Sequence, residues 1–69
     1  MLTEYYKYEN GTDTYIFRIE YKTIYTDIAY DSTYCKPNDP RWRGTSWVPE
    51  TIKQRAKKIT YNEMVLELL

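Results

Sequence analysis

Apolar and polar side chains alternate along the first third of the chain. The clearest run spans residues 14–21, where four large side chains share one face: Tyr15, Phe17, Ile19 and Tyr21. A period of two predicts a half-buried strand. Residues 3–8 are also rich in strand formers, and they end just before Asn10 and Gly11, a pair that tolerates positive φ and favours a tight hairpin. The N-terminal part therefore predicts an antiparallel hairpin.

The apolar phase changes after this strand. Ile24, Ile28 and Tyr30 lie at even positions, whereas the preceding apolar positions are odd. Because a shift of one residue moves a side chain to the other face of a sheet, something between Tyr21 and Thr23 must absorb it. A bulge in one long strand over residues 14–30 would do so, and so would a turn. The turn with a third strand is favoured, since three strands form a more stable sheet than one hairpin.

The second half of the chain predicts a long loop and then helix. Periodicity disappears from Asp31 to Trp47, a stretch that contains several residues typical of turns: Pro37, Asn38, Asp39, Pro40 and Gly44. Pro49 suits the first turn of a helix, and residues 50–58 have a basic face opposite an apolar one. Residues 60–63 match a capping box that opens a second short helix, with a final strand over residues 64–69 as the competing interpretation.

These elements predict a single small α+β domain over residues 1–69. We expect an antiparallel sheet of two to three N-terminal strands, packed on one side by one or two C-terminal helices.

Composition argues against catalysis. The chain has 69 residues, no histidine, two glycines and a single cysteine, Cys35. The missing histidine removes the commonest general base and metal ligand, so Cys35 has no partner that would activate it. Too few glycines remain for a phosphate-binding loop. We expect no enzyme activity, no cofactor and no metal.

One thiol without an export signal or membrane span favours a cytoplasmic protein.

Tyrosine is the most over-represented residue, with nine copies, eight of them within the first 34 residues. Tyr15, Tyr21 and Tyr30 share faces with apolar residues and are expected at the rim of the core. Tyr5 and Tyr25 fall on the other side of the predicted sheet, together with Ile16 and Arg18. Such a surface has the composition of a partner-binding patch. Cross-strand pairing on a solvated face explains it equally well.

Residues 41–47 form a segment rich in arginine and tryptophan. Trp and Arg are enriched at binding hot spots, so Arg41, Trp42 and Arg43 are further candidates for partner contact, with Trp42 expected to be exposed. Trp47 adjoins the predicted helix and is expected to fill the seam between helix and sheet.

The charges are segregated although the net charge is zero. Residues 1–34 are acidic and residues 35–58 are basic, and three lysines lie on the predicted helix: Lys53, Lys57 and Lys58. These lysines, with the Arg/Trp segment 41–47, would suit a nucleic acid, although such domains usually carry a strong net positive charge. A solvated helix face is the simpler interpretation.

The favoured function is a non-catalytic protein-binding module, by analogy a small regulator or inhibitor of a larger machine, such as those that viruses encode. Nucleic-acid binding is one alternative. A self-associating structural subunit is another, because Leu66 and Leu69 lie off the apolar stripe of the tail helix and would gain from burial in a homodimer.

Overall fold

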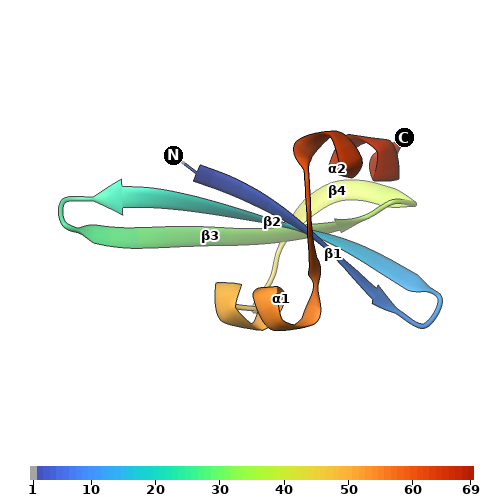
Figure 1. Cartoon of the computed structure of the whole chain (residues 1–69), viewed down its shortest axis with the longest axis horizontal. Helices are drawn as coiled ribbons and strands as arrows, with labels where there is room; N and C mark the ends of the chain where they lie inside the picture. The colour runs from blue at the N-terminus through green and yellow to red at the C-terminus, as the bar shows by residue number, and fades with distance from the viewer. Residues whose placement is uncertain (1) are drawn as a thin grey trace.

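The computed structural model describes residues 2–69. It contains five strands and two short helices, which follow one another as β1 (Leu2–Asn10), β2 (Asp13–Ile24), β3 (Asp27–Lys36), β4 (Asp39–Gly44), α1 (Pro49–Arg55), β5 (Lys57–Ile59) and α2 (Tyr61–Leu68). All strand pairs are antiparallel, and the strand order in the single sheet is β4-β3-β2-β1-β5. The molecule is elongated along the β2–β3 hairpin, with extents of 41 × 21 × 19 Å (Figure 1).

The two helices lie on opposite faces of the sheet (Figure 1). We call these the α1 face and the α2 face. Ile52 of α1 packs in one buried cluster with Tyr6, Phe17 and Ile19. Met64 of α2 packs in the other, whose remaining buried members are Ile16, Cys35 and Ile59. Successive strand residues point to opposite faces, so β2 contributes to both clusters.

The short strand β5 explains how the chain moves from one face to the other. It pairs with the middle of β1 along the edge of the sheet, with Ile59 opposite Tyr5 and Lys58 opposite Tyr6. The chain thus leaves α1 on one face, runs along the edge, and enters α2 on the other.

These features overturn the predicted architecture. The sheet has five strands rather than two to three, and one helix covers each face rather than both covering one side. Ile16 is the clearest local consequence: it was expected on an outward surface but is fully buried beneath α2.

The first hairpin was predicted correctly. Its strands pair from Leu2–Tyr21 to Asn10–Asp13, which leaves a two-residue loop of Gly11 and Thr12. Gly11 has a φ of 63°, a left-handed conformation that glycine adopts without steric cost.

The second hairpin explains the change of apolar phase. β2 continues without a turn to Ile24, and the loop consists of Tyr25 and Thr26, so the turn expected between Tyr21 and Thr23 is wrong in position. The predicted third strand does form. Tyr30 pairs with Tyr21, so even positions of β3 share a face with odd positions of β2, and the antiparallel turn itself absorbs the shift for Ile28 and Tyr30. Ile24 still belongs to β2 and pairs with Asp27, so it lies on the α2 face and does not share a face with Ile28 and Tyr30 as expected. Tyr30 was expected at the rim of the core but is 50% exposed.

The predicted loop over residues 31–47 is mostly strand. β3 runs to Lys36, and β4 pairs with it after a two-residue turn, with an irregularity in register between Tyr34 and Lys36. β4 is an edge strand, so Pro40 is tolerated there although it cannot donate a hydrogen bond.

Both helices begin where the sequence indicated. Pro49 is at the start of α1, but this helix ends at Arg55, so residues 57–59 are strand rather than the end of a helix over 50–58. The capping box of α2 is present: Glu63 N donates to the Thr60 hydroxyl at 3.1 Å, and Thr60 N donates to the Glu63 carboxylate at 3.0 Å. The alternative of a final strand over residues 64–69 is wrong.

Candidate functional site

The six residues predicted to bind a partner occupy three separate places in the fold. Tyr5, Arg18 and Trp42 lie on the α2 face, Arg41 and Arg43 lie on the opposite side of β4, and Tyr25 lies alone at the tip of the β2–β3 hairpin. The structure therefore does not gather them into one surface.

On the α2 face, Arg18 stacks over Trp42. The Arg18 guanidinium carbon lies 4.4 Å from the centre of the Trp42 ring, and its Nε donates to the Thr33 hydroxyl at 3.3 Å. Trp42 is half-buried against the Met64 cluster, so the expectation that it is exposed is wrong. Tyr5 is also half-buried, with its ring edge-on to Tyr61 at 5.9 Å. These three side chains extend the core under α2 toward the sheet edge.

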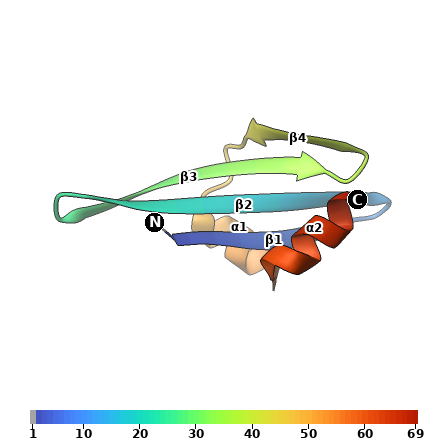
Figure 2. The ribbon, with the colours of Figure 1, turned by 90° about the horizontal axis from the view of Figure 1, so that it is seen from above.

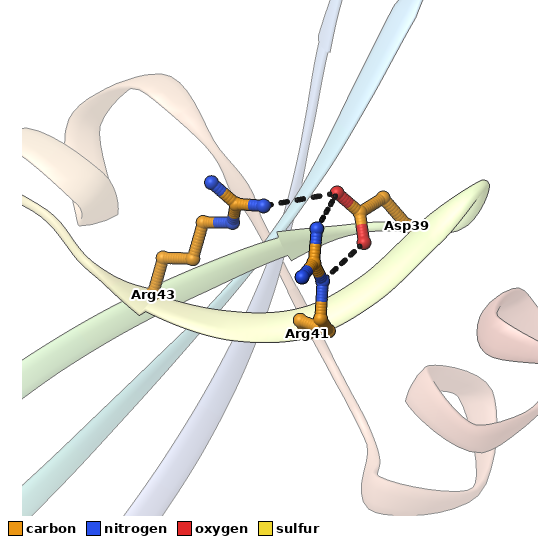
Figure 3. A network of polar contacts seen from close by, with 3 residues as sticks. All are labelled: Asp39, Arg41 and Arg43. Atoms are coloured by element: carbon orange, nitrogen blue, oxygen red, sulfur yellow. Dashed lines mark hydrogen bonds and ion pairs between the residues drawn. The ribbon is translucent and has the colours of Figure 1, made fainter.

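On the other side of β4, Arg41 and Arg43 converge on one carboxylate (Figure 3). Arg41 Nε lies 3.0 Å from Asp39 Oδ1, and one Arg43 nitrogen lies 3.2 Å from Asp39 Oδ2. The hydrogen bond from Arg41, helped by the charge of Arg43, lowers the pKa of Asp39. The cluster is exposed and keeps one surplus positive charge, which solvent screens.

The three lysines proposed for nucleic-acid contact do not form one surface either. Lys58 donates to Glu4 at 3.2 Å on the α1 face, and Lys53 approaches the same carboxylate at 3.9 Å. Lys57 points to the α2 face, because it is the neighbour of Lys58 in strand β5. Two of the three lysines therefore share the single negative charge of Glu4 within the fold.

Glu4 joins β1 to both α1 and β5. Burial raises the pKa of this carboxyl, but the hydrogen bond and charge of Lys58, together with Lys53 and the Tyr6 hydroxyl, outweigh that effect and lower it below the ordinary 4.5. Glu4 is therefore held ionised by its neighbours.

An open aromatic cleft of about 400 Å³ lies on the α1 face near the end of α1. Trp47 forms its wall, stacked on Phe17 at 5.1 Å and edge-on to Tyr8 at 5.2 Å, as expected for a residue that fills the seam between helix and sheet. Arg55 lies over the Trp47 ring at 5.6 Å, and Lys36 over the Tyr15 ring at 4.9 Å. The chain's own cations thus occupy the ring faces that a cationic ligand would use.

The most exposed apolar surface is at the opposite end of the sheet. Leu2, the first described residue of β1, lies opposite Tyr21. Within residues 2–69, residues 22–29 therefore form a two-stranded ribbon that projects beyond the rest of the sheet (Figure 2). We call this ribbon the hairpin arm. It carries Ile24, Tyr25 and Ile28, which are 50%, 96% and 73% exposed, and Leu2 and Tyr30 adjoin its base.

Sequence reasoning selected Tyr25 from this surface but not its neighbours. Ile24 and Ile28 were assigned to a core face because they fit the apolar period. Their exposure follows from the length of the β2–β3 hairpin, since the described helices pack only under its central part. An open groove of about 900 Å³ runs along the base of the arm on the α1 face, lined in part by Leu2, Tyr21 and Ile28.

The one thiol lies away from this surface. Cys35 is 1% exposed within the Met64 cluster, and burial raises its pKa, so the thiol is unreactive in the folded protein. Neither helix in the described part of the chain is long and apolar enough to cross a membrane.

Comparison with protein-family models, curated proteins and solved structures yields no match, so the function has to be argued from this geometry alone.

Proposed function

We propose that the protein is a non-catalytic protein-binding module whose contact surface is the hairpin arm with Leu2 and Tyr30 at its base. The observation that supports this most strongly is that five exposed apolar side chains lie at the end of the sheet that neither described helix covers. Leu2, Ile28 and Tyr30 lie on the α1 face, Tyr25 lies at the tip and Ile24 lies on the α2 face. Apolar side chains gathered on an exposed surface of a small protein mark interaction sites.

The size of the patch fits a protein partner. The exposed fractions of these five side chains add up to a little over three whole side chains. With roughly 200 Å² for a side chain of this size, the five offer about 650 Å² over the tip and both faces of the ribbon, and about 550 Å² without Ile24 on the α2 face. A standard interface buries about 800 Å² on each partner, so flanking polar atoms would supply the remainder.

The tip residue supports the same conclusion. Tyr25 has a φ of 57°, the conformation that Gly11 adopts at the same position of the first hairpin. A tyrosine there costs stability, and its ring makes little contact within the molecule because it is 96% exposed. A side chain that the fold does not need, held at the tip of a projecting ribbon, suits a contact role. Tyrosine is also among the residues enriched at binding hot spots.

Within this proposal the protein acts as a small regulator or inhibitor of a larger protein. The single unpaired thiol suits a reducing compartment, so we also propose a cytoplasmic location.

Photo-crosslinking tests the contact surface. A benzoylphenylalanine placed at position 25 is compared with the same group at position 12, which lies in the equivalent loop of the first hairpin and is also exposed. We expect a discrete cross-linked protein from position 25 and not from position 12. Affinity for the purified partner should then fall at least fivefold in Tyr25→Ala, while the circular dichroism spectrum is retained.

Equal cross-linking from both positions, or full affinity of Tyr25→Ala, would overturn the assignment of the arm. Tight, salt-sensitive binding of random single-stranded DNA or RNA in a gel-shift assay would instead favour the nucleic-acid alternative.

A further inference from the structure

The outer edge of β3 is open along the hairpin arm. β2 pairs with the inner edge of β3, and β4 pairs with its outer edge only at Thr33, Tyr34 and Lys36. Within residues 2–69 no strand therefore pairs with the outer edge of the segment from Asp27 to Asp31. In Figure 2 no strand lies along this edge between the end of β4 and the hairpin tip. Unpaired strand edges accept a further strand readily, because their peptide groups are already aligned.

The orientation of the peptide groups follows from one hydrogen bond. Thr45, the residue after β4, donates its N–H to the Ser32 carbonyl oxygen at 3.4 Å from the outer side of β3. The N–H and C=O groups of Ser32 therefore point to the outer edge of β3. Peptide orientation alternates along a strand, and Ile28 and Tyr30 therefore face the same way. Their N–H and C=O groups are available to a neighbouring chain.

The two faces of this edge differ in chemistry. Ile28 and Tyr30 place exposed apolar side chains on the α1 face. Asp27 and Asp31, both exposed, lie on the α2 face on either side of Ala29. A strand added here would meet apolar side chains on one face and two carboxylates on the other.

We propose that an extended segment of a partner protein, in which apolar residues alternate with lysine or arginine, adds to β3 along residues 27–31. This inference rests on the protein-binding function proposed above and specifies how the partner is recognised. Main-chain hydrogen bonds hold the added strand, Ile28 and Tyr30 contact its apolar residues, and the carboxylates select its basic residues.

The same carboxylates disfavour a second copy of the chain as the occupant, because self-pairing along residues 27–31 brings four carboxylates onto one strand pair, most closely in the register centred on Ala29. Symmetric antiparallel pairing centred on Ala29 would place Asp27 of each copy opposite Asp31 of the other, and directly opposed like charges destabilise a strand pair. Acidic residues at an edge also prevent aggregation. That protective role predicts no preference for a basic strand, so the two roles give different results in a binding experiment.

The probe is an end-blocked octapeptide of alternating lysine and valine, titrated into the ¹⁵N-labelled full chain. The controls are a peptide of the same composition with its lysines and valines in two blocks, and an alternating glutamate and valine peptide. We expect the alternating basic peptide to shift the amide resonances of Ile28 and Tyr30 and to slow their hydrogen exchange. Equal effects of all three peptides, or shifts confined to other residues, would overturn the proposal.

Two sets of variants separate the backbone from the charges. Ile28→Pro removes an outward N–H, which an edge strand tolerates, whereas Ile28→Ala shortens the side chain and keeps the N–H. We expect affinity for the basic peptide to fall at least tenfold in the proline variant and no more than about threefold in the alanine variant. Asp27→Lys combined with Asp31→Lys should reverse the preference toward the glutamate peptide. A double variant that still prefers the basic peptide contradicts recognition by these carboxylates.

The outcome is distinguishable from failure of the proposed function. If Tyr25→Ala lowers the affinity for the cross-linked partner but Ile28→Pro binds that partner with full affinity, the arm is a binding surface and strand addition is wrong. If neither substitution lowers the affinity for the partner, both proposals are wrong.

Discussion

Tyr25 and Gly11 occupy the first position of two equivalent two-residue hairpin loops, and both adopt positive φ. Glycine at this position carries no steric penalty, whereas the tyrosine does. Replacing Tyr25 with glycine should therefore stabilise the fold, although the change removes a large aromatic side chain. Such a result would identify Tyr25 as a residue kept for a purpose other than folding.

The expected magnitude follows from two opposing terms. The left-handed conformation costs an ordinary L-residue roughly 1–2 kcal/mol. Glycine relieves this strain, but its greater conformational freedom in the unfolded chain lowers the free energy of unfolding by about 0.5–1 kcal/mol. Loss of packing is small because the ring is 96% exposed. The two terms leave a net gain of about 0–1.5 kcal/mol. We expect Tyr25→Gly to raise the free energy of unfolding by about 0.75 kcal/mol, which is about 3–6 °C in Tm for a domain of this size.

Urea and thermal unfolding followed by circular dichroism measure this change. Tyr25→Ala is the matched control, because it removes the ring but leaves a side-chain-bearing residue in the strained conformation, so its stability should stay within about 0.5 kcal/mol of the parent. Gly11→Ala gives the reciprocal test. A Cβ there meets open space, so any loss of about 1 kcal/mol or more must come from the backbone conformation.

The reasoning is refuted if Tyr25→Gly and Tyr25→Ala both lower stability by more than about 1 kcal/mol. That pattern would show that the ring contributes packing in the folded state, and Tyr25 would then need no functional explanation.

Three further predictions concern other parts of the fold. Cys35 should react with a thiol reagent only at the rate of global unfolding, because burial raises its pKa and encloses it; rapid labelling under native conditions would contradict this. The pKa of Glu4 lies below its ordinary 4.5, so ionised Glu4 stabilises the fold fully above that pH, and this stabilisation is lost as the pH falls through the lowered pKa. Glu4→Gln should therefore flatten this part of the pH–stability curve, as measured by urea unfolding at several pH values. Leu66 is 69% and Leu69 92% exposed in the tail helix, so a homodimer through this surface should dissociate in Leu66→Lys while the fold is retained. If analytical ultracentrifugation finds only monomer from micromolar to millimolar concentration, the homodimer alternative is wrong.

Local signals predicted their elements well. The strand over residues 14–21, the hairpin at Gly11, the helix start at Pro49 and the capping box of α2 all form as expected. Each depends on neighbouring residues alone, namely side-chain alternation, a residue that tolerates positive φ, or a side chain that caps nearby amides. Such signals can be recognised in a single sequence.

The elements that sequence reasoning missed depend on distant parts of the chain. β4 contains Pro40, which a central strand would exclude and an edge strand tolerates. β5 is only three residues long and exists because β1 offers it an edge. The second loop contains no glycine, proline or asparagine to mark it, since Tyr25 takes the left-handed position.

The placement of the helices could not be predicted for the same reason. Tyr15, Ile16 and Phe17 form an apolar run within an alternating strand, and we interpreted Ile16 as an exception on a solvated face. It is buried because α2 covers that face. The candidate site was predicted only at Tyr25, since exposure of the arm depends on where both helices stop covering the sheet.

The two hairpins of this one sheet make the same turn with different residues. Both end in a two-residue loop with threonine second and a positive φ in first place. The first loop lies between Asn10 and Asp13 and has glycine at its first position. It is polar and unstrained, as expected of a loop selected for stability and solubility. The second lies between Ile24 and Asp27, with tyrosine in place of glycine and Ile28 after the aspartate. It is therefore more apolar than the first, exposed, and strained at the tip. Because the chain achieves the same turn at lower cost in its first hairpin, the composition of the second supports the proposal that a partner buries it.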